Sequence, residues 1–252
     1  MDDYIIISFL YYILSFLKTG IAIGTVILSI IITKKDKNAK FFAFYLIPMC
    51  CNYFISVFNP MILRVSANAY VSVSRVTTYV GAALTLAALI SVGMYAKRRY
   101  DSKAHIVIPC SYIVVGIVTT VANMIAVSMA RGNGENVLMD NIVVATAISL
   151  ILQLIPHIIT VYVFYKNSSK EEKFPSLWKI FYLITVASGL NDLISLVDMY
   201  DSIHKSVASS VTALLPEVGP LVPLLARLGL SIYVLRKLSA EKSLSGAGED
   251  QD

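Results

Sequence analysis

The sequence predicts an all-α integral membrane protein: a seven-transmembrane helix bundle with its N-terminus outside and its C-terminus in the cytoplasm. Of the 252 residues, 57% are hydrophobic and only 15% are charged, whereas soluble domains carry about 25% charged residues. The mean hydropathy is correspondingly high, at +0.72. Apolar runs recur along the whole chain, and the basic residues between them alternate from one loop to the next. These observations predict that lipid forms part of the solvent around this chain.

Seven apolar runs are each long enough to cross a hydrocarbon layer of ~30 Å as a helix. They fall at roughly 4–33, 41–63, 70–96, 104–130, 138–165, 175–198 and 208–236. The first run lacks a basic leader and is too long for a signal peptide, so we expect it to remain as the first span. Because the runs leave no room for a soluble domain, we expect one seven-transmembrane bundle over 1–238. A disordered cytoplasmic tail should follow over 239–252.

The positions of lysine and arginine set the expected orientation. Basic residues follow the first, third, fifth and seventh runs: Lys34, Lys35, Lys37, Lys40, Lys97, Arg98, Arg99, Lys103, Lys166, Lys170, Lys173, Lys179, Arg236, Lys237 and Lys242. The loops between them hold only Arg64, Arg131 and Lys205. By the positive-inside rule, the basic loops face the cytoplasm. We therefore expect a multi-pass protein of the plasma membrane.

Three segments of the chain share the pattern of one known family. The stretch from Asp36 to Pro48 leads into a second apolar run, 225–229 reads Leu-Ala-Arg-Leu-Gly, and 75–79 reads Arg-Val-Thr-Thr-Tyr. These segments resemble the second, seventh and third helices of bacteriorhodopsin and its microbial-rhodopsin relatives. The family's seventh helix carries L-A-K-x-G and its third carries R-x-x-D-W. The sixth helix is dissimilar, because Trp178 is the single tryptophan of the chain. The resemblance implies a seven-helix fold around a retinal pocket.

The resemblance also implies positions for holding retinal, and this sequence departs from them. Arg227 stands at the position of the retinal lysine. A guanidinium stays protonated, with a pKa above ~12, and does not form a Schiff base. Thr78 and Pro223 stand where the family has its two counter-ion aspartates, and Tyr79 replaces a tryptophan of the retinal cage. We therefore expect no covalent retinal and no other cofactor. Lys18, the other lysine well inside a span, has no pocket-like sequence around it.

Charged residues within the apolar runs are candidate site residues, because each costs roughly 2.5–3.5 kcal/mol to insert unless it finds a partner or water. Arg75, Asp192 and Glu217 all fall in the outer parts of their runs, and we hypothesise that they form a polar cluster. Alternatively, the two acids face interfacial water. Arg227 lies deeper. Three interpretations of Arg227 are open. Backbone and hydroxyl groups satisfy its donors, or it binds an anion or ligand in the vacated retinal cavity, or its side chain snorkels to the surface.

Prolines and aromatic residues predict local features. Pro216, Pro220 and Pro223 predict a bent or partly unwound seventh helix, which is either a repaired kink or the border of a ligand site. We expect His157 to be a hydrogen-bonded packing residue, and the alternative is that it relays protons. An aromatic belt at the inner interface is expected from Tyr95, Tyr100, Tyr162 and Tyr165.

Three functions fit these features. The first is a microbial-rhodopsin-like protein without covalent retinal, acting as a non-photoactive sensor, interaction protein or stress-type membrane protein. The second is an ion channel or transporter with a polar interior path. The third is a G-protein-coupled-type receptor, although Arg98-Arg99-Tyr100-Asp101 is not an E/D-R-Y order. No spacing indicates an enzyme, a metal site or nucleic-acid binding. The bilayer is the expected partner, while a small ligand or ion in the bundle interior and a homo-oligomer remain open.

Overall fold

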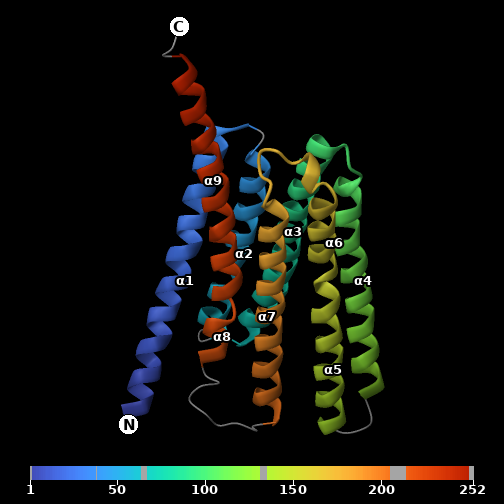
Figure 1. Ribbon diagram of the computed structural model, residues 1–252. Helices are drawn as coiled ribbons and strands as arrows, with labels where there is room; N and C mark the ends of the chain where they lie inside the picture. Colours follow the sequence, from blue (N-terminus) through green and yellow to red (C-terminus); the bar gives the residue numbers. More distant parts are fainter. Residues whose placement is uncertain (1, 38, 64–66, 131–134, 205–213, 250–252) are drawn as a thin grey trace.

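A computed structural model of the chain describes residues 2–37, 39–63, 67–130, 135–204 and 214–249. Its described part is all-helical, at 91% helix and without strands. The long helices lie side by side as one bundle, with the N-terminus at one end and the C-terminus at the other (Figure 1).

The helices follow the apolar runs closely. They are α1 Asp2–Lys35, α2 Lys40–Leu63, α3 Ala67–Tyr100, α4 Ala104–Ala130, α5 Glu135–Gln153, α6 Ile155–Lys166, the 3₁₀ helix η1 Ser168–Lys170, α7 Leu177–His204, α8 Leu215–Val218 and α9 Leu221–Glu249. The fifth run is divided into α5 and α6, and the seventh into α8 and α9. α9 continues through Glu249, where the sequence led us to expect disorder from residue 239.

Within the part of the chain that the structure describes, five helices are long and apolar enough to span a membrane, so the chain is an integral membrane protein. They are Phe9–Lys35, Val76–Tyr100, Ala104–Ala126, Val143–Lys166 and Leu177–Tyr200, and α2 adds a shorter apolar helix over Lys40–Ile55. Large apolar side chains cover the outside of the bundle, among them Phe16, Met124 and Ile151. Lipid is the solvent that suits such a surface. α9 is not among the five. Its apolar stretch contains Arg227 and ends at Arg236 and Lys237.

The helices close into a ring in chain order. Each of α1 to α4 packs on the next, the α5–α6 pair joins α4 to α7, and α9 packs on both α7 and α1. Gly93 permits one very close approach between α3 and α4: a Cβ atom there would lie 2.8 Å from the His105 Cα atom. The ring arrangement leaves an interior that all of its helices can reach.

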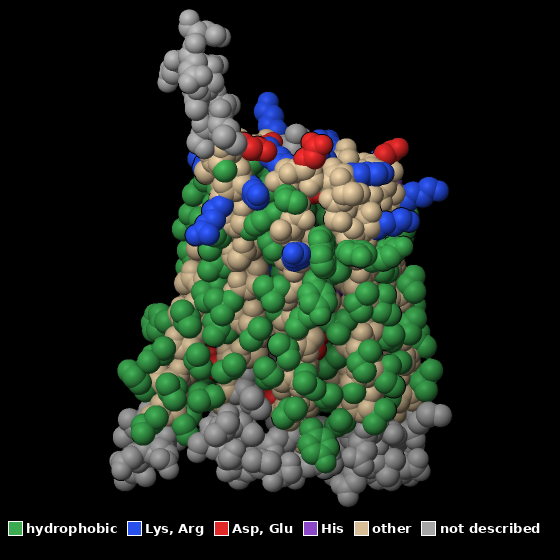
Figure 2. All heavy atoms as spheres, in the orientation of Figure 1, with side chains coloured by type: hydrophobic (Ala, Val, Ile, Leu, Met, Phe, Trp, Pro, Cys, Tyr) green, Lys and Arg blue, Asp and Glu red, His purple; other side chains and the backbone are tan. Residues whose placement is uncertain are grey.

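One end of this interior is filled by an aromatic core. Phe164 stacks on Phe181 with ring centroids 4.8 Å apart, and Phe42 lies 4.5 Å from Tyr95. We call this end of the bundle the basic end, because the connections at 36–39, 101–103 and 167–176 and the far part of α9 lie there with their lysines and arginines. On the face drawn in Figure 2, Lys and Arg side chains gather toward this end.

The aromatic belt expected at this end is only partly present. Tyr162 and Tyr165 are 59% and 58% exposed, as an interfacial belt requires. Tyr95 and Tyr100 are buried instead, at 5% and 7% exposed, so placing them in the belt was wrong. Their hydroxyl groups have an internal partner, which is described below.

Candidate functional site

A cavity of about 690 Å³ lies inside the bundle, between α2, α3, α4, the α5–α6 junction, α7 and α9. Each of these segments contributes polar side chains to the lining. They are Asn52, Thr77, Thr78, Thr85, Thr119, Gln153, His157, Ser188, Asn191, Asp192 and Arg227. Apolar side chains such as Met49, Ile113 and Leu224 complete the wall. The interior of the bundle is therefore hollow and polar in one region and packed in another.

The cavity occupies the half of the bundle away from the basic end. On α3 it is lined from Thr77 to Thr85, while the buried Leu89 and Val92 belong to the packed core that follows. On α9 the lining ends at Arg227, and Leu230 and Val234 continue as core. The aromatic core therefore separates the cavity from the basic end.

Arg227 is the cation of this cavity. Its Nε atom is buried without a hydrogen-bond partner, and within the described residues no carboxylate forms an ion pair with it. Tyr45, Cys50 and His157 lie within electrostatic range of the guanidinium. A charged donor left unsatisfied in a low-dielectric interior costs more than the ~1–3 kcal/mol of a neutral one. The site favours an anion or ordered water at Arg227.

Two polar atoms on α7 are also buried without a hydrogen-bond partner. The Ser188 Oγ and Asn191 Oδ1 atoms are buried and have no hydrogen-bond partner. Asp192 accepts a hydrogen bond of 3.4 Å from the Asn191 Nδ2 group. These side chains line the same cavity as Arg227, so α7 supplies acceptors and a hydroxyl donor to the cavity that the α9 cation also lines. The arrangement can hold a polar molecule by several contacts at once.

Two breaks between consecutive helices border the cavity. α5 ends at Gln153 and α6 starts at Ile155, and Gln153 and His157 on either side of the break line the cavity. Pro156 has no N–H to continue the α5 ladder, which explains the break. The break between α8 and α9 falls at Gly219 and Pro220, and Pro220 also lines the cavity.

The structure brings four of the seven candidate site residues to this cavity: Thr78, Asp192, Pro223 and Arg227. Tyr79 is 76% exposed and is not part of the lining. The side chain of Arg75 lies outside the described residues. Glu217 lies elsewhere, on α8. None of the described residues that line the cavity is a lysine, the residue type that forms a Schiff base with retinal.

Glu217 forms a buried ion pair with Lys18 of α1. The two residues are only 8% and 4% exposed. The structure thus gives Glu217 a different partner from those expected in the Arg75–Asp192–Glu217 cluster. A lysine and a glutamate that each cost free energy to insert into lipid neutralise one another here.

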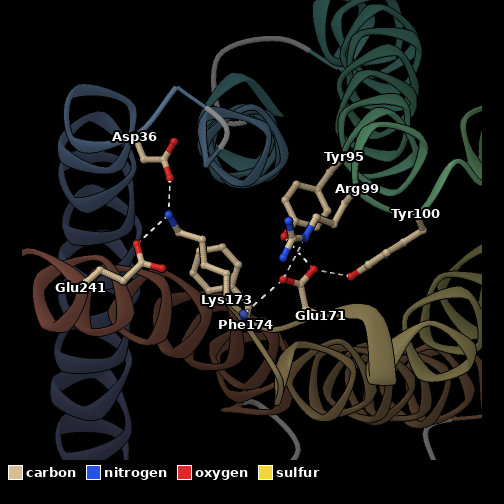
Figure 3. A network of polar contacts seen from close by, with 8 residues as sticks. All are labelled: Asp36, Tyr95, Arg99, Tyr100, Glu171, Lys173, Phe174 and Glu241. Atoms are coloured by element: carbon tan, nitrogen blue, oxygen red, sulfur yellow. Dashed lines mark hydrogen bonds and ion pairs between the residues drawn. The ribbon is translucent and has the colours of Figure 1, made fainter. Parts of the chain in front are cut away.

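A second polar cluster, which the sequence did not reveal, lies at the basic end (Figure 3). Glu171 is 3% exposed and accepts hydrogen bonds from the Tyr95 and Tyr100 hydroxyls at 2.9 and 2.5 Å. It also accepts one from the Phe174 N–H at 3.2 Å and pairs with the Arg99 Nε atom at 3.6 Å. The only sequence signal was a glutamate placed among lysines in a short loop.

Lys173 joins three separate segments at the same end. Its ammonium group lies 2.7 Å from both the Asp36 and the Glu241 carboxylates. Partial burial alone would lower the pKa of Lys173, but hydrogen bonds to these two acids outweigh it and raise the pKa above its usual value. Glu241 lies on α9 in the segment expected to be disordered, and its ion pair with Lys173 fixes that part of the helix.

The comparisons with known proteins give no relative. The chain matches no protein-family model, no curated protein and no solved structure. The resemblance to microbial rhodopsins therefore stays a prediction from the sequence. Within the described residues, no group of three or more His, Cys, Asp or Glu side chains could hold a metal ion.

Proposed function

We propose that this integral membrane protein is a non-photoactive sensor that binds a small organic anion reversibly in the cavity around Arg227. In this proposal the bundle has seven spans, places its basic end in the cytoplasm, and is a divergent relative of the microbial rhodopsins without covalent retinal. The ligand enters where those relatives would hold their chromophore.

One observation carries the proposal: a permanent cation lines a large internal cavity, and its buried Nε atom has no partner. A volume of about 690 Å³ lies within the ~300–1,000 Å³ of typical small-molecule sites. Guanidinium presents its N–H groups in a planar fork that matches a carboxylate. A carboxylate ligand would supply the charge that the described residues do not.

The rest of the lining supports an organic anion in preference to a simple inorganic one. Met49, Ile113 and Leu224 provide apolar wall, and Ser188 and Asn191 on α7 provide further hydrogen-bonding groups. A simple halide would satisfy Arg227 alone and leave those groups to water. A molecule with a carboxylate, an apolar body and a second polar group would contact all three parts of the lining.

The experiment is a ligand screen on the purified full chain in lipid nanodiscs, read as the midpoint of thermal unfolding. The probes are acetate, benzoate and naphthoate, each beside its uncharged amide. We expect the larger carboxylates to raise the midpoint, the amides to have little effect, and Arg227→Gln to abolish the difference. Equal effects of acid and amide, or an unchanged response in Arg227→Gln, would contradict the proposal. Retinal added to the wild type should give no visible band that survives denaturation.

A second candidate function, transport of the same anion, is favoured by the two helix breaks. Discontinuous helices border substrate sites in many transporters, and the breaks at Leu154 and at Gly219–Pro220 both border this cavity. The aromatic core would then close the path toward the basic end in this conformation. Uptake of labelled benzoate into proteoliposomes distinguishes a transporter from a sensor. A transporter takes up the label and exchanges it for excess unlabelled benzoate, whereas a sensor does neither.

A further inference from the structure

A second hollow, which we call the basic hollow, opens at the basic end of the bundle and shares no lining residue with the central cavity. Its volume is about 160 Å³, and it is lined by Phe41, Tyr95, Arg98, Arg99, Lys173 and Phe174. Three of these six residues are cations, and none is an acid. The inference drawn from it is independent of the proposed function.

The three cations retain hydrogen-bond donors. Arg98 stacks over the Phe41 ring at 5.0 Å, and within the described residues it forms no ion pair. Arg99 uses only its Nε atom toward Glu171, which leaves its terminal nitrogens. Lys173 uses two of its three donors, toward Asp36 and Glu241. Each cation can therefore give at least one more hydrogen bond without losing a partner.

Two of these cations are paired with acids that are not among the lining residues of the hollow. Arg99 pairs with the buried Glu171, and Lys173 lies between the Asp36 and Glu241 carboxylates (Figure 3). The acids hold Arg99 and Lys173 in place, so these side chains lose less conformational entropy when they bind an anion. Arg98 supplies a positive charge that no described acid offsets.

We propose that the basic hollow binds a phosphomonoester group at the membrane–water boundary. Such a group carries a charge of about −1.5 to −2 and three strong acceptor oxygens, and three cations with free donors line the hollow. The hollow has a volume of about 160 Å³, which is enough for a phosphate and its ester oxygen. The hollow lies at the end of the spans, where a lipid such as phosphatidic acid would present its phosphomonoester headgroup.

The same chemistry could come from a lipid headgroup or from a soluble phosphate, and the experiment separates the two sources. The full chain is placed in nanodiscs of phosphatidylcholine doped with either phosphatidic acid, which has a phosphomonoester, or phosphatidylserine, which does not. Bound lipid is counted by native mass spectrometry. In a second arm, inorganic phosphate is added to the protein in detergent, and the unfolding midpoint is followed.

The variants are Arg98→Gln and the matched control Lys97→Gln, an exposed neighbour that removes the same charge without lining the hollow. We expect the wild type to prefer phosphatidic acid, and Arg98→Gln to weaken that preference about ten-fold while Lys97→Gln keeps it. Stabilisation by inorganic phosphate that depends on Arg98, without a lipid preference, would also support the site and assign it a soluble ligand.

Two results would overturn the proposal. One is an equal loss of binding in the Arg98 and Lys97 variants, because that indicates general surface charge and not a site. The other is the absence of any Arg98-dependent response to phosphatidic acid and to inorganic phosphate. Both variants change exposed side chains, so their folding can be verified by an unchanged midpoint without ligand.

Discussion

Lys18 of α1 and Glu217 of α8, 199 positions apart in the chain, form a buried ion pair that joins the first helix to the short helix before α9. The pair lies beside a small apolar cluster of Ile21, Ala22, Tyr53 and Leu224. Leu224 also lines the central cavity. The contact therefore fixes the position of the α8–α9 break, from which the Arg227 segment follows.

Removing one partner of this pair should be costly. Lys18→Met leaves the Glu217 charge buried without a partner, and we expect a loss of roughly 3–5 kcal/mol of stability. The double variant Lys18→Met/Glu217→Leu removes both charges and should lose much less. Unfolding in detergent micelles measures both, with the exposed Lys34→Met as the control. If Lys18→Met alone left the stability unchanged, the result would contradict the ion pair.

Glu171 should matter far more than its neighbour in sequence. Glu171→Gln keeps the shape but weakens the bonds from Tyr95, Tyr100 and Arg99, and we expect it to cost about 1–3 kcal/mol. Glu172→Gln is the matched control, since Glu172 is exposed. Thermal unfolding compares the two. Similar midpoints for both variants would show that the buried cluster does not stabilise the basic end.

The contribution of Lys173 should depend on pH in a defined direction. Its folded pKa lies above the unfolded value of ~10.4. Its contribution is therefore fully present below pH ~10.4 and is lost as the pH rises through the folded pKa. The difference in unfolding midpoint between wild type and Lys173→Gln should be constant from about pH 7 to 9 and then decline. It should also shrink at about 1 M salt, because the pair is partly exposed. A difference that grows above pH ~10.4 would have the wrong sign.

The α3–α4 contact predicts a strong difference between two glycines. A methyl group at Gly93 would meet backbone atoms of Ala104 and His105 at 2.8–3.2 Å, whereas one at Gly229 would meet nothing within 4 Å. Gly93→Ala should cost about 1–3 kcal/mol, and Gly229→Ala should be neutral or slightly stabilising because alanine favours helix. The unfolding midpoints of the Gly93→Ala and Gly229→Ala variants test this difference in stability. Equal stability would show that the helices are not so close at Gly93.

Much of the fold followed from hydropathy alone. The fourth run, 104–130, coincides with α4, because its apolar residues end where the helix ends. The third run was predicted to end at 96, yet α3 continues to Tyr100 through Lys97, Arg98 and Arg99, which are polar but favour helix. The helix stops at Asp101, which has a positive φ of 52°. Hydropathy thus locates spans better than it locates helix ends.

The site was less accessible to sequence reasoning. Arg227 stood out because a mid-span cation is expensive, and Pro223 because it interrupts a span. The partner of Glu217 could not be found in this way, since no local spacing links it to Lys18. Tyr95 and Tyr100 were misplaced because a tyrosine near a span end suits either an interface or a buried carboxylate. Only the folded α6–α7 connection brings Glu171 to them.

The central claim is that Arg227 gives an open internal cavity a positive potential, and labelling of one introduced cysteine tests it most directly. In a variant with Cys50, Cys51 and Cys110 replaced by alanine, His157→Cys lines the cavity near Arg227. Its reaction rates with an anionic and a cationic methanethiosulfonate are compared. We predict that both react, that the anionic reagent is faster, and that Arg227→Gln removes its advantage. No reaction at position 157, or a ratio unaffected by Arg227→Gln, would contradict the account.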